Sequence, residues 1–275
     1  MPPGQPEQPD GGGMPPDVRS RIHVSDALAA AARALRDDPQ RMPGALCQAC
    51  VRLLPVTGAS VSISGGRGVQ VTWCASDRVA ARLAELQYTL GDGPCQTSLD
   101  QGAPVIAADL TAGRDARRWP VFAHEAAGLG VFAVFSLPLG VSGAAVGTLD
   151  LYCDQVGGLS EPDLRTALWV RDAVTYALMS VQPAYGTDDE AEEGVASWLE
   201  ASEADHTEVY QAVGMVMVQI EVDPEQALDR MRARAFAEGR TVSQVARDVL
   251  ARKLRFQPEP DDPDDDEQGR DGDRS

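Results

Sequence analysis

The sequence has few of the residues that most active sites and membrane proteins need. It holds three histidines, which makes a Ser–His–Asp arrangement improbable, and it contains neither a GxxxxGK[ST] nor a GxGxxG phosphate-binding pattern. No apolar run is long enough to cross a bilayer, and the first residues lack the basic and apolar regions of a secretory signal. We therefore expect a cytoplasmic protein that is not an enzyme and does not contact membranes.

Cysteine is also scarce, with five residues in 275. An odd number in a chain of this size disfavours a disulfide framework. Cys47 and Cys50 form a CxxC pattern that a helix would place on one face, where a redox or metal role is conceivable. No second CxxC and no nearby HxxxH completes a zinc set, so we expect both cysteines to pack in a core. No metal and no cofactor is predicted.

Charge is distributed unevenly along the chain. A net charge of −18 argues against general affinity for nucleic acids or membranes. Residues 186–208 nevertheless hold nine acidic and no basic residues, and residues 230–255 hold eight basic and two acidic ones. The tail over 257–275 returns to nine acidic and two basic residues. Positive charge between two acidic flanks is a functional clue, and we expect the acidic tail to compete for the same arginines.

Residues 22–182 show the pattern of an α+β domain with a mostly antiparallel sheet flanked by helices. Two β-branched runs, ASVSIS and VQVTWCAS, flank GGRG and predict a hairpin. The runs VFAVFSLPLG and AAVGTLDLYC predict a second, stronger hairpin, and GDGPC predicts a turn. Helices are predicted over SDALAAAARALRDD, PQRMPGALCQACVRLLPV, DRVAARLAELQ and the long segment from the N-cap Ser160 to Gln182.

The remainder of the chain predicts an all-α three-helix bundle. Residues 1–20 are rich in proline and glycine and are expected to be disordered, as is the tail over 257–275. Residues 183–204 form an acidic linker by composition. Within residues 205–256, apolar residues recur at helical spacing between 209 and 220, and Asp223 and Thr241 have the sequence context of N-caps. Each helix alone is marginal, so the three are expected to share one core.

The C-terminal segment resembles the ANTAR domain, a three-helix RNA-binding module of bacterial antitermination regulators. The matching residues are QAVGMVM at 211–217, DPEQALDRMRARAF at 223–236 and VARDVLARKL at 245–254. Val213 stands where the family often has a lysine, so no RNA contact is assigned there. Arg232 matches the family arginine that follows the apolar residue of the second helix.

The front domain resembles a GAF domain, a sensory α/β module that binds small ligands or forms dimers. The stretches that carry the resemblance are GDGPCQTSLDQGAPVIAADL, RRWPVFAHEAAGLGVFAVFSLPL and GTLDLYC. The order GAF then ANTAR is similar to that of actinobacterial regulators. The resemblance implies an unknown small-molecule ligand, and a possible lining for its cavity is Trp73, Trp119, Phe122 and His124; the alternative for these residues is plain core.

The basic segment supplies the candidate RNA-binding residues. Arginines hold single-stranded RNA loops by contacting phosphates and stacking on bases. Arg230 and Arg234 share a helix face and are the first choice, whereas Arg232 could instead tie helices together. The alternative is a solvated face that binds nothing. The complete predicted set is Arg230, Arg232, Arg234, Arg240, Arg247, Arg252 and Lys253.

Together these features predict a signal-responsive regulator that binds stem-loops in nascent RNA as a transcription antiterminator. The helix over 161–182 is long and carries the stripe Leu164, Leu168, Val174, Leu178 and Val181, which predicts a homodimer seam. A DNA-binding regulator is one alternative, because TVSQVARDVL resembles the opening of a helix-turn-helix. A sensor or scaffold whose C-terminal bundle binds protein is another.

Overall fold

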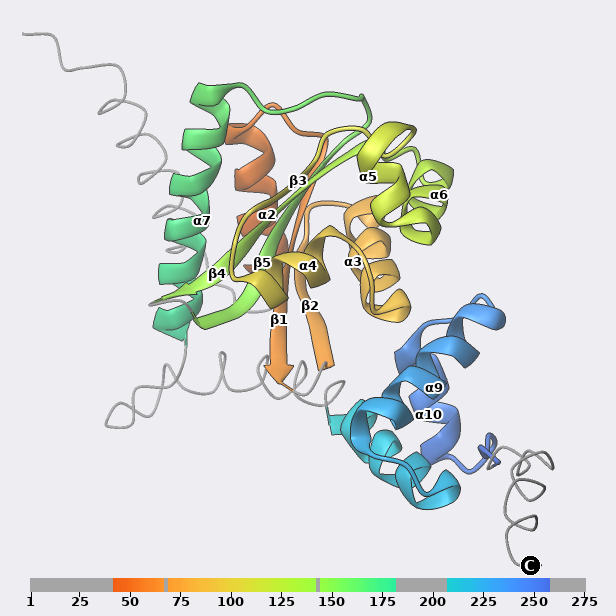
Figure 1. The fold of residues 1–275 in the computed structure, drawn as a ribbon. Coiled ribbons are helices and arrows are strands. Elements are labelled where there is room, and N and C mark those ends of the chain that lie inside the picture. The colour runs from red at the N-terminus through yellow and green to blue at the C-terminus, as the bar shows by residue number, and fades with distance from the viewer. Residues whose placement is uncertain (1–41, 67–68, 142–143, 182–206, 258–275) are drawn as a thin grey trace, which may run out of the picture.

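The structure is a computed structural model whose described residues form a sheet-containing domain and a helical bundle (Figure 1). The helix predicted before residue 39, the acidic linker over 183–204 and both terminal segments lie outside the described residues. The domain boundaries predicted from composition remain predictions. The described residues are 42–66, 69–141, 144–181 and 207–257.

A five-stranded antiparallel sheet organises the first domain, as predicted, with the strand order β2-β1-β5-β4-β3. The two predicted hairpins become β1–β2 and β4–β5, and β5 pairs with β1 to join them. Gly147 allows β5 to approach β1 closely, because a Cβ at this position would lie 2.2 Å from the carbonyl oxygen of Ser62. The strands are β1 (Gly58–Gly66), β2 (Val69–Ala75), β3 (Val105–Ala107), β4 (Ala133–Val141) and β5 (Ala144–Cys153).

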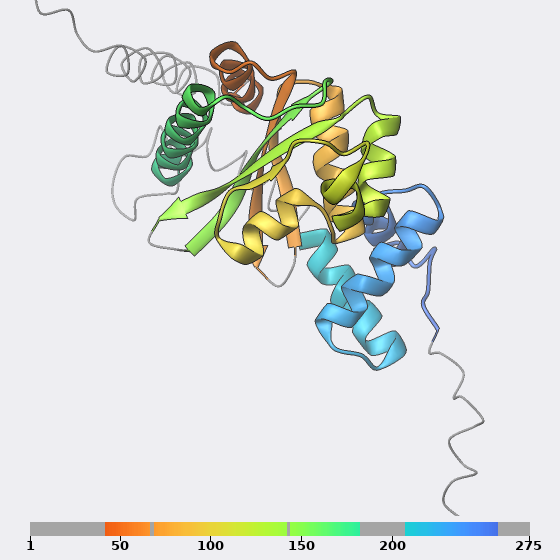
Figure 2. The ribbon, with the colours of Figure 1, turned by 45° about the horizontal axis from the view of Figure 1, so that its top comes forward.

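One face of the sheet is covered by α2 (Met42–Leu53) and α7 (Glu161–Val181), which lie side by side in both ribbon views (Figures 1 and 2). Alternate residues of β4 and β5 point into this layer and are entirely apolar. Removing them from water is the main stabilising term of the domain. Fully buried members of this core are Leu46, Val61, Phe135, Leu137, Leu139, Leu149, Leu151, Val170 and Val174.

The opposite face is covered by α3 (Arg78–Leu90), α4 (Pro94–Gln101), α5 (Gly113–Arg118) and α6 (Pro120–Gly128). Asp77 caps α3, because its carboxylate accepts hydrogen bonds from the backbone N–H groups of Val79 and Ala80 at 2.7 and 2.9 Å. The turn predicted at GDGPC ends at Gly93. The last two residues of that stretch, Pro94 and Cys95, begin α4, which the sequence did not predict. A proline in the first helical position is favourable for such a start.

The apolar stripe of α7 faces the protein's own core. Val174 and Leu178 are buried in the layer between α7 and the sheet, and Leu168 packs against the same cluster. Two of its five residues are thus buried against the sheet, and a dimer seam along α7 stays a prediction. Tyr176 is the large hydrophobic residue that α7 leaves exposed among the described side chains, at 77% of its surface.

The C-terminal bundle consists of a helix over 207–220, α9 (Pro224–Ala237) and α10 (Val242–Leu250). The predicted caps are present: Asp223 accepts from the N–H of Gln226 at 2.9 Å, and Thr241 and Gln244 form a reciprocal capping box. The shared core consists of Val209, Ala212, Val216, Ala227, Leu228, Met231, Ala235, Val242, Val245, Ala246 and Val249.

The bundle lies against α3 of the first domain, on the side away from α7 (Figures 1 and 2). None of the helices in the described part of the chain is both long enough and apolar enough to span a membrane.

Candidate functional site

Three basic residues at the end of α10 form an exposed cationic group. Arg247 lies in the last turn of the helix, and Arg252 and Lys253 follow in the turn after it. All three are exposed, and the described residues provide no ion pair to any of them. Arg247 uses its Nε–H to bond the carbonyl of Ser243 at 3.3 Å, which leaves its terminal nitrogens directed outward. This group, the α10 cations, can accept phosphates without breaking an existing ion pair.

A second set of arginines is held by acidic residues of the bundle itself. Arg240 donates to Glu238 at 2.9 Å and to Asp248 at 2.5 Å, and it thereby ties the turn before α10 to that helix. Arg234 donates to the same Glu238 at 2.5 Å. These two arginines hold the pKa of Glu238 below its usual value, with Arg240 the larger cause. Both arginines already have carboxylate partners that a phosphate would have to displace.

Arg232 points away from solvent and toward the first domain. Its Nε–H donates to the carbonyl oxygen of Tyr88 at 3.2 Å, and its guanidinium lies 5.5 Å from the centroid of the Tyr88 ring. Asp229, one turn earlier on α9, bonds its Nη1 at 3.1 Å. The side chain is only 13% exposed. The sequence suggested that Arg232 could tie helices together. In the structure it connects α9 of the bundle with α3 of the first domain.

Arg230 is exposed on α9, one helical turn before Arg234. The seven predicted RNA-binding residues thus fall into distinct environments. Arg247, Arg252 and Lys253 are exposed at the end of α10, Arg230 is exposed on α9, Arg234 and Arg240 pair within the bundle, and Arg232 is buried against α3. The contacts of these residues with RNA stay predictions.

The face of the sheet beneath α4 is lined by buried polar side chains. The strand register places Ser60 opposite Asp150 and Asp150 opposite Ser136, so these three side chains lie in one row on the same face. Thr148 lies on this face one row along, because residues two apart on a strand point the same way. All four residues are at most 2% exposed. A polar layer this deeply covered contrasts with the apolar layer on the other face.

A chain of hydrogen bonds runs through this layer, which we call the polar chamber. Gln70 donates to the Cys95 sulfur at 2.9 Å, and that sulfur lies 3.1 Å from Thr148 Oγ1. Thr148 in turn donates to Asp150 Oδ2 at 3.1 Å, and Ser136 donates to Oδ1 at 2.5 Å. Burial raises the pKa of Asp150 to about 6, despite the hydrogen bonds that favour its charged form. Burial raises the pKa of Cys95 as well, so it remains a thiol at neutral pH.

Gln87 closes the polar chamber from α3. Its side-chain oxygen accepts the backbone N–H of Cys95 at 2.8 Å and so fixes the start of α4. Its amide nitrogen is buried, and no other group in the described part of the chain bonds it. A buried donor without a partner costs about 1–3 kcal/mol. The Gln87 amide therefore retains a buried donor that a further polar group could satisfy.

The four residues predicted to line a ligand cavity are not brought together. Trp73 lies in the apolar layer beneath α2 and α7. Trp119 and Phe122 pack in the other layer, against α3 and the sheet, and Trp119 Nε1 donates to Thr97 at 3.1 Å. His124 is exposed on α6. That these four residues line one pocket stays a prediction. The residues of the polar chamber were not identified from the sequence.

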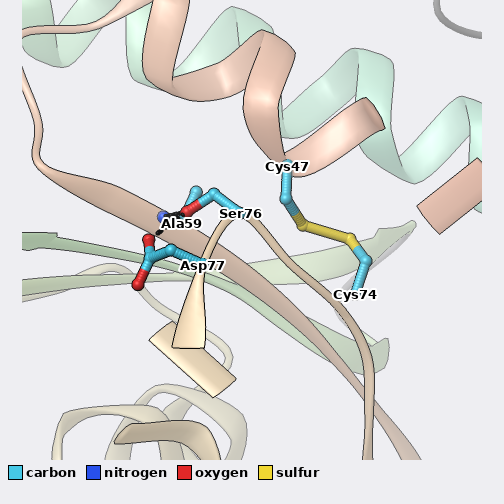
Figure 3. The surroundings of a disulfide bond; sticks show 5 residues. All are labelled: Cys47, Ala59, Cys74, Ser76 and Asp77. Carbon is cyan, nitrogen blue, oxygen red and sulfur yellow. Dashed lines mark hydrogen bonds between the residues drawn. A yellow bond between two sulfur atoms is a disulfide. The ribbon is translucent and has the colours of Figure 1, made fainter. Parts of the chain in front are cut away.

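A disulfide joins Cys47 of α2 to Cys74 of β2 (Figure 3). Cys47 and Cys50 are both buried in the core, as expected, but the sequence did not predict the disulfide of Cys47, whose partner lies 27 residues away. Cys50 is a free, fully buried thiol whose pKa burial raises to about 12. No group of residues in the described ranges could hold a metal ion.

Two family comparisons agree with this division of the chain. Residues 36–168 match the GAF domain, and residues 199–250 match the ANTAR domain. GAF domains are sensory modules and ANTAR domains are RNA-binding modules of antiterminators, so the chain combines two regulatory domains. No curated protein sequence matches the chain.

Solved structures show a weak similarity to this chain. The GAF domain of a phosphoenolpyruvate-protein phosphotransferase from Coxiella burnetii is 12% identical, with a TM-score of 0.46 over 60% of this chain and 96% of that one. A domain of a putative two-component sensor histidine kinase from Sinorhizobium meliloti 1021 is 16% identical, with a TM-score of 0.41 over 49% and 87%.

Proposed function

We propose that the protein is a signal-responsive transcription antiterminator that binds stem-loops in nascent RNA through its ANTAR bundle. The observation that carries the proposal is the exposed group of α10 cations in a chain of net charge −18. Such a local concentration of positive charge is where a polyanion would bind. The bundle would hold a stem-loop and so prevent a terminator hairpin from forming. This activity requires no covalent chemistry and would take place in the cytoplasm.

The α10 cations are the proposed primary contacts, together with the exposed Arg230 of α9. Arg252 adopts a left-handed backbone conformation with φ 56° in the turn after α10, and the chain beyond it packs back on the bundle, where the N–H of Phe256 donates to Gln219 at 2.8 Å. Arginine suits this position because its planar guanidinium can contact a phosphate and stack on an unpaired base. Arg234 and Arg240 would contribute mainly by holding the turn between α9 and α10.

The polar chamber is the proposed sensory site of the GAF domain. Its hydroxyl groups, its carboxyl and the amide of Gln87 can donate and accept hydrogen bonds, so they suit a small polar ligand rather than an apolar one. We further propose that the protein acts as a homodimer. Because Val174 and Leu178 are buried against the sheet, we place the seam on the outer face of α7 around Tyr176.

The test is a salt titration of RNA binding by the full chain and two double variants. The probe is a pool of RNA hairpins with randomised loops. Arg252→Ala together with Lys253→Ala should weaken binding and lower the slope of log affinity against log salt by about 0.7 per lost phosphate contact. The matched control is Arg114→Ala together with Arg117→Ala, which removes the same charge from exposed positions on α5.

Equal slopes and affinities for the two double variants would contradict the assignment of the α10 cations. Arg252→Ala keeps a Cβ at position 252, so the strain of its left-handed backbone does not change, and the fold should be retained. Tighter binding of a DNA duplex than of the RNA hairpins would favour the DNA-binding alternative. In the structure the chain continues from α10 to residue 257 without a further helix, so the described residues supply no recognition helix after it.

A further inference from the structure

The carboxyl end of α3 presents two groups to Arg232. The first is the carbonyl oxygen of Tyr88, which lies in the last turn of α3 and also accepts the N–H of Gly91. Carbonyls at this end of a helix carry the partial negative charge of the helix dipole, which favours a cation. The second is the Tyr88 ring, which lies below the guanidinium. An acceptor with negative character and an aromatic face are also what an RNA loop offers to an arginine.

Tyr88 anchors the bundle to α3 through apolar contact as well. It is 4% exposed, and its ring belongs to the same buried cluster as Val213 and Val216 of the helix over 207–220 and Met231 of α9. Burial raises the pKa of Tyr88, and Arg232 partly offsets that rise. Arg232 is therefore enclosed by an aromatic ring and a helix end, and RNA cannot reach it in this arrangement.

Part of the boundary between the domains is incompletely filled. Beside the Tyr88 contact lies a cleft of about 200 Å³ between α3 and the turn from α9 to α10. Charged side chains from both domains line it, together with the half-exposed Phe236. Incompletely filled boundaries between domains are typical of contacts that separate and re-form. The charged residues of the lining are Arg82, Glu85, Glu125 and Arg240.

We propose that the carboxyl end of α3 competes with RNA for Arg232, so that the docked bundle is a low-affinity state of the regulator. The proposal rests on the RNA-binding function proposed above and adds the residue pair that controls it. In the docked state, the Tyr88 carbonyl and ring occupy the guanidinium. In the released state, the same guanidinium joins the α10 cations in holding RNA. The apparent affinity for RNA then equals the intrinsic affinity multiplied by the fraction of released molecules.

Gly91 offers a way to release the bundle with little change to the first domain. It has φ 64° and ends α3, and a Cβ there would lie 3.1–3.3 Å from three atoms of Arg232. Asparagine tolerates this backbone conformation better than other side chains. Gly91→Asn should therefore preserve the end of α3 while its side chain displaces Arg232. Gly130→Asn is the matched control, because Gly130 has φ 78° and open space around its Cβ direction.

The experiment compares the full-length protein with Gly91→Asn, Gly130→Asn and Tyr88→Ala. Hydrogen exchange of peptides that cover 86–93 and 228–235 reports docking, and binding of the randomised RNA hairpins reports function. If about one molecule in ten is released in the parent protein, Gly91→Asn and Tyr88→Ala should tighten the apparent Kd about tenfold. Both should also speed exchange in the two peptides. Gly130→Asn should change neither quantity.

A double variant separates the release of Arg232 from any other effect of the Gly91→Asn substitution. In the Arg232→Ala background, Gly91→Asn should no longer tighten RNA binding, because the residue that it releases is missing. Faster hydrogen exchange of the two peptides with an unaltered Kd for RNA would overturn the proposed competition between α3 and RNA for Arg232. Unaltered exchange in both Gly91→Asn and Tyr88→Ala would overturn it as well. If hydrogen exchange reveals release of the bundle but neither the parent nor the variants bind RNA, the proposed RNA-binding function fails, and the competition for Arg232 fails with it. The contact between the bundle and α3 would still be supported in that case.

Discussion

The two faces of the sheet are built from the same strands but have opposite chemistry. On β5, Leu149 and Leu151 point into the layer beneath α2 and α7, where they pack in a cluster of buried apolar side chains. Thr148 and Asp150 point the other way, into the polar chamber beneath α4. Burying apolar side chains stabilises a fold, whereas burying hydroxyls and a carboxyl roughly breaks even at best. The first face is built from apolar contacts. On the second face a polar row lies beside a further apolar cluster that includes Trp119, Phe122 and Val134, and this row is the better candidate for a function.

Neighbouring substitutions on β5 should expose this difference most strongly. Leu149→Ala should lower the free energy of unfolding by about 4 kcal/mol, because it leaves a cavity in a fully buried apolar layer. Thr148→Val keeps the volume and removes only the hydroxyl, so it should cost about 1 kcal/mol. Denaturant unfolding of both variants measures the two values. Equal losses would show that the polar face contributes to stability as much as the apolar one.

The disulfide extends the comparison, because it fastens α2 to the sheet on the apolar side only. Reducing it, or replacing Cys74 with Ser, should lower the free energy of unfolding by about 3–4 kcal/mol for a loop of this sequence separation. Cys153→Ser is the control, since Cys153 is a free and partly buried cysteine. Thermal unfolding with and without dithiothreitol checks the prediction, and an effect of dithiothreitol on the Cys74→Ser variant would contradict it.

Asp150 should make the stability of the polar face depend on pH. Its pKa is about 6 in the folded protein against an ordinary value of 3.8, so folding favours the protonated form. The stabilisation is complete below the unfolded value and is lost as pH rises through about 6, by up to about 3 kcal/mol. Asp150→Asn cannot titrate and should flatten this part of the profile. Unfolding free energies measured from about pH 4 to pH 7 provide the test, and parallel profiles for the two proteins would contradict it.

Local patterns were sufficient to predict most of the fold. The alternation in AAVGTLDLYC identified β5, and the capping residues Asp223 and Thr241 identified the starts of α9 and α10. The start of α4 was missed because GDGPC contains strong turn residues, and only its first three positions form the turn. In these cases the information lies within a few residues, and local propensities are enough to read it.

The candidate sites depend on contacts that the sequence does not record. Alternation in TLDLY predicts two faces of a strand, but it does not tell that α4 covers the polar one. Cys47 and Cys74 are joined by the packing of α2 on β2, which their spacing does not reveal. Tyr88 appeared as an ordinary residue of an amphipathic helix, and its role follows only from the place where the bundle docks. Each of these features requires knowledge of which elements touch.

Two adjacent residues of α3 face the two candidate sites, since Gln87 closes the polar chamber and Tyr88 holds Arg232. One helix therefore forms part of both binding equilibria, and thermodynamic linkage follows if they are coupled. A ligand that weakens the hold of α3 on Arg232 by some factor must itself bind more tightly, by the same factor, once RNA is bound. The RNA would then act as an effector of the sensory domain, and each transcript captured would prolong the residence of the signal.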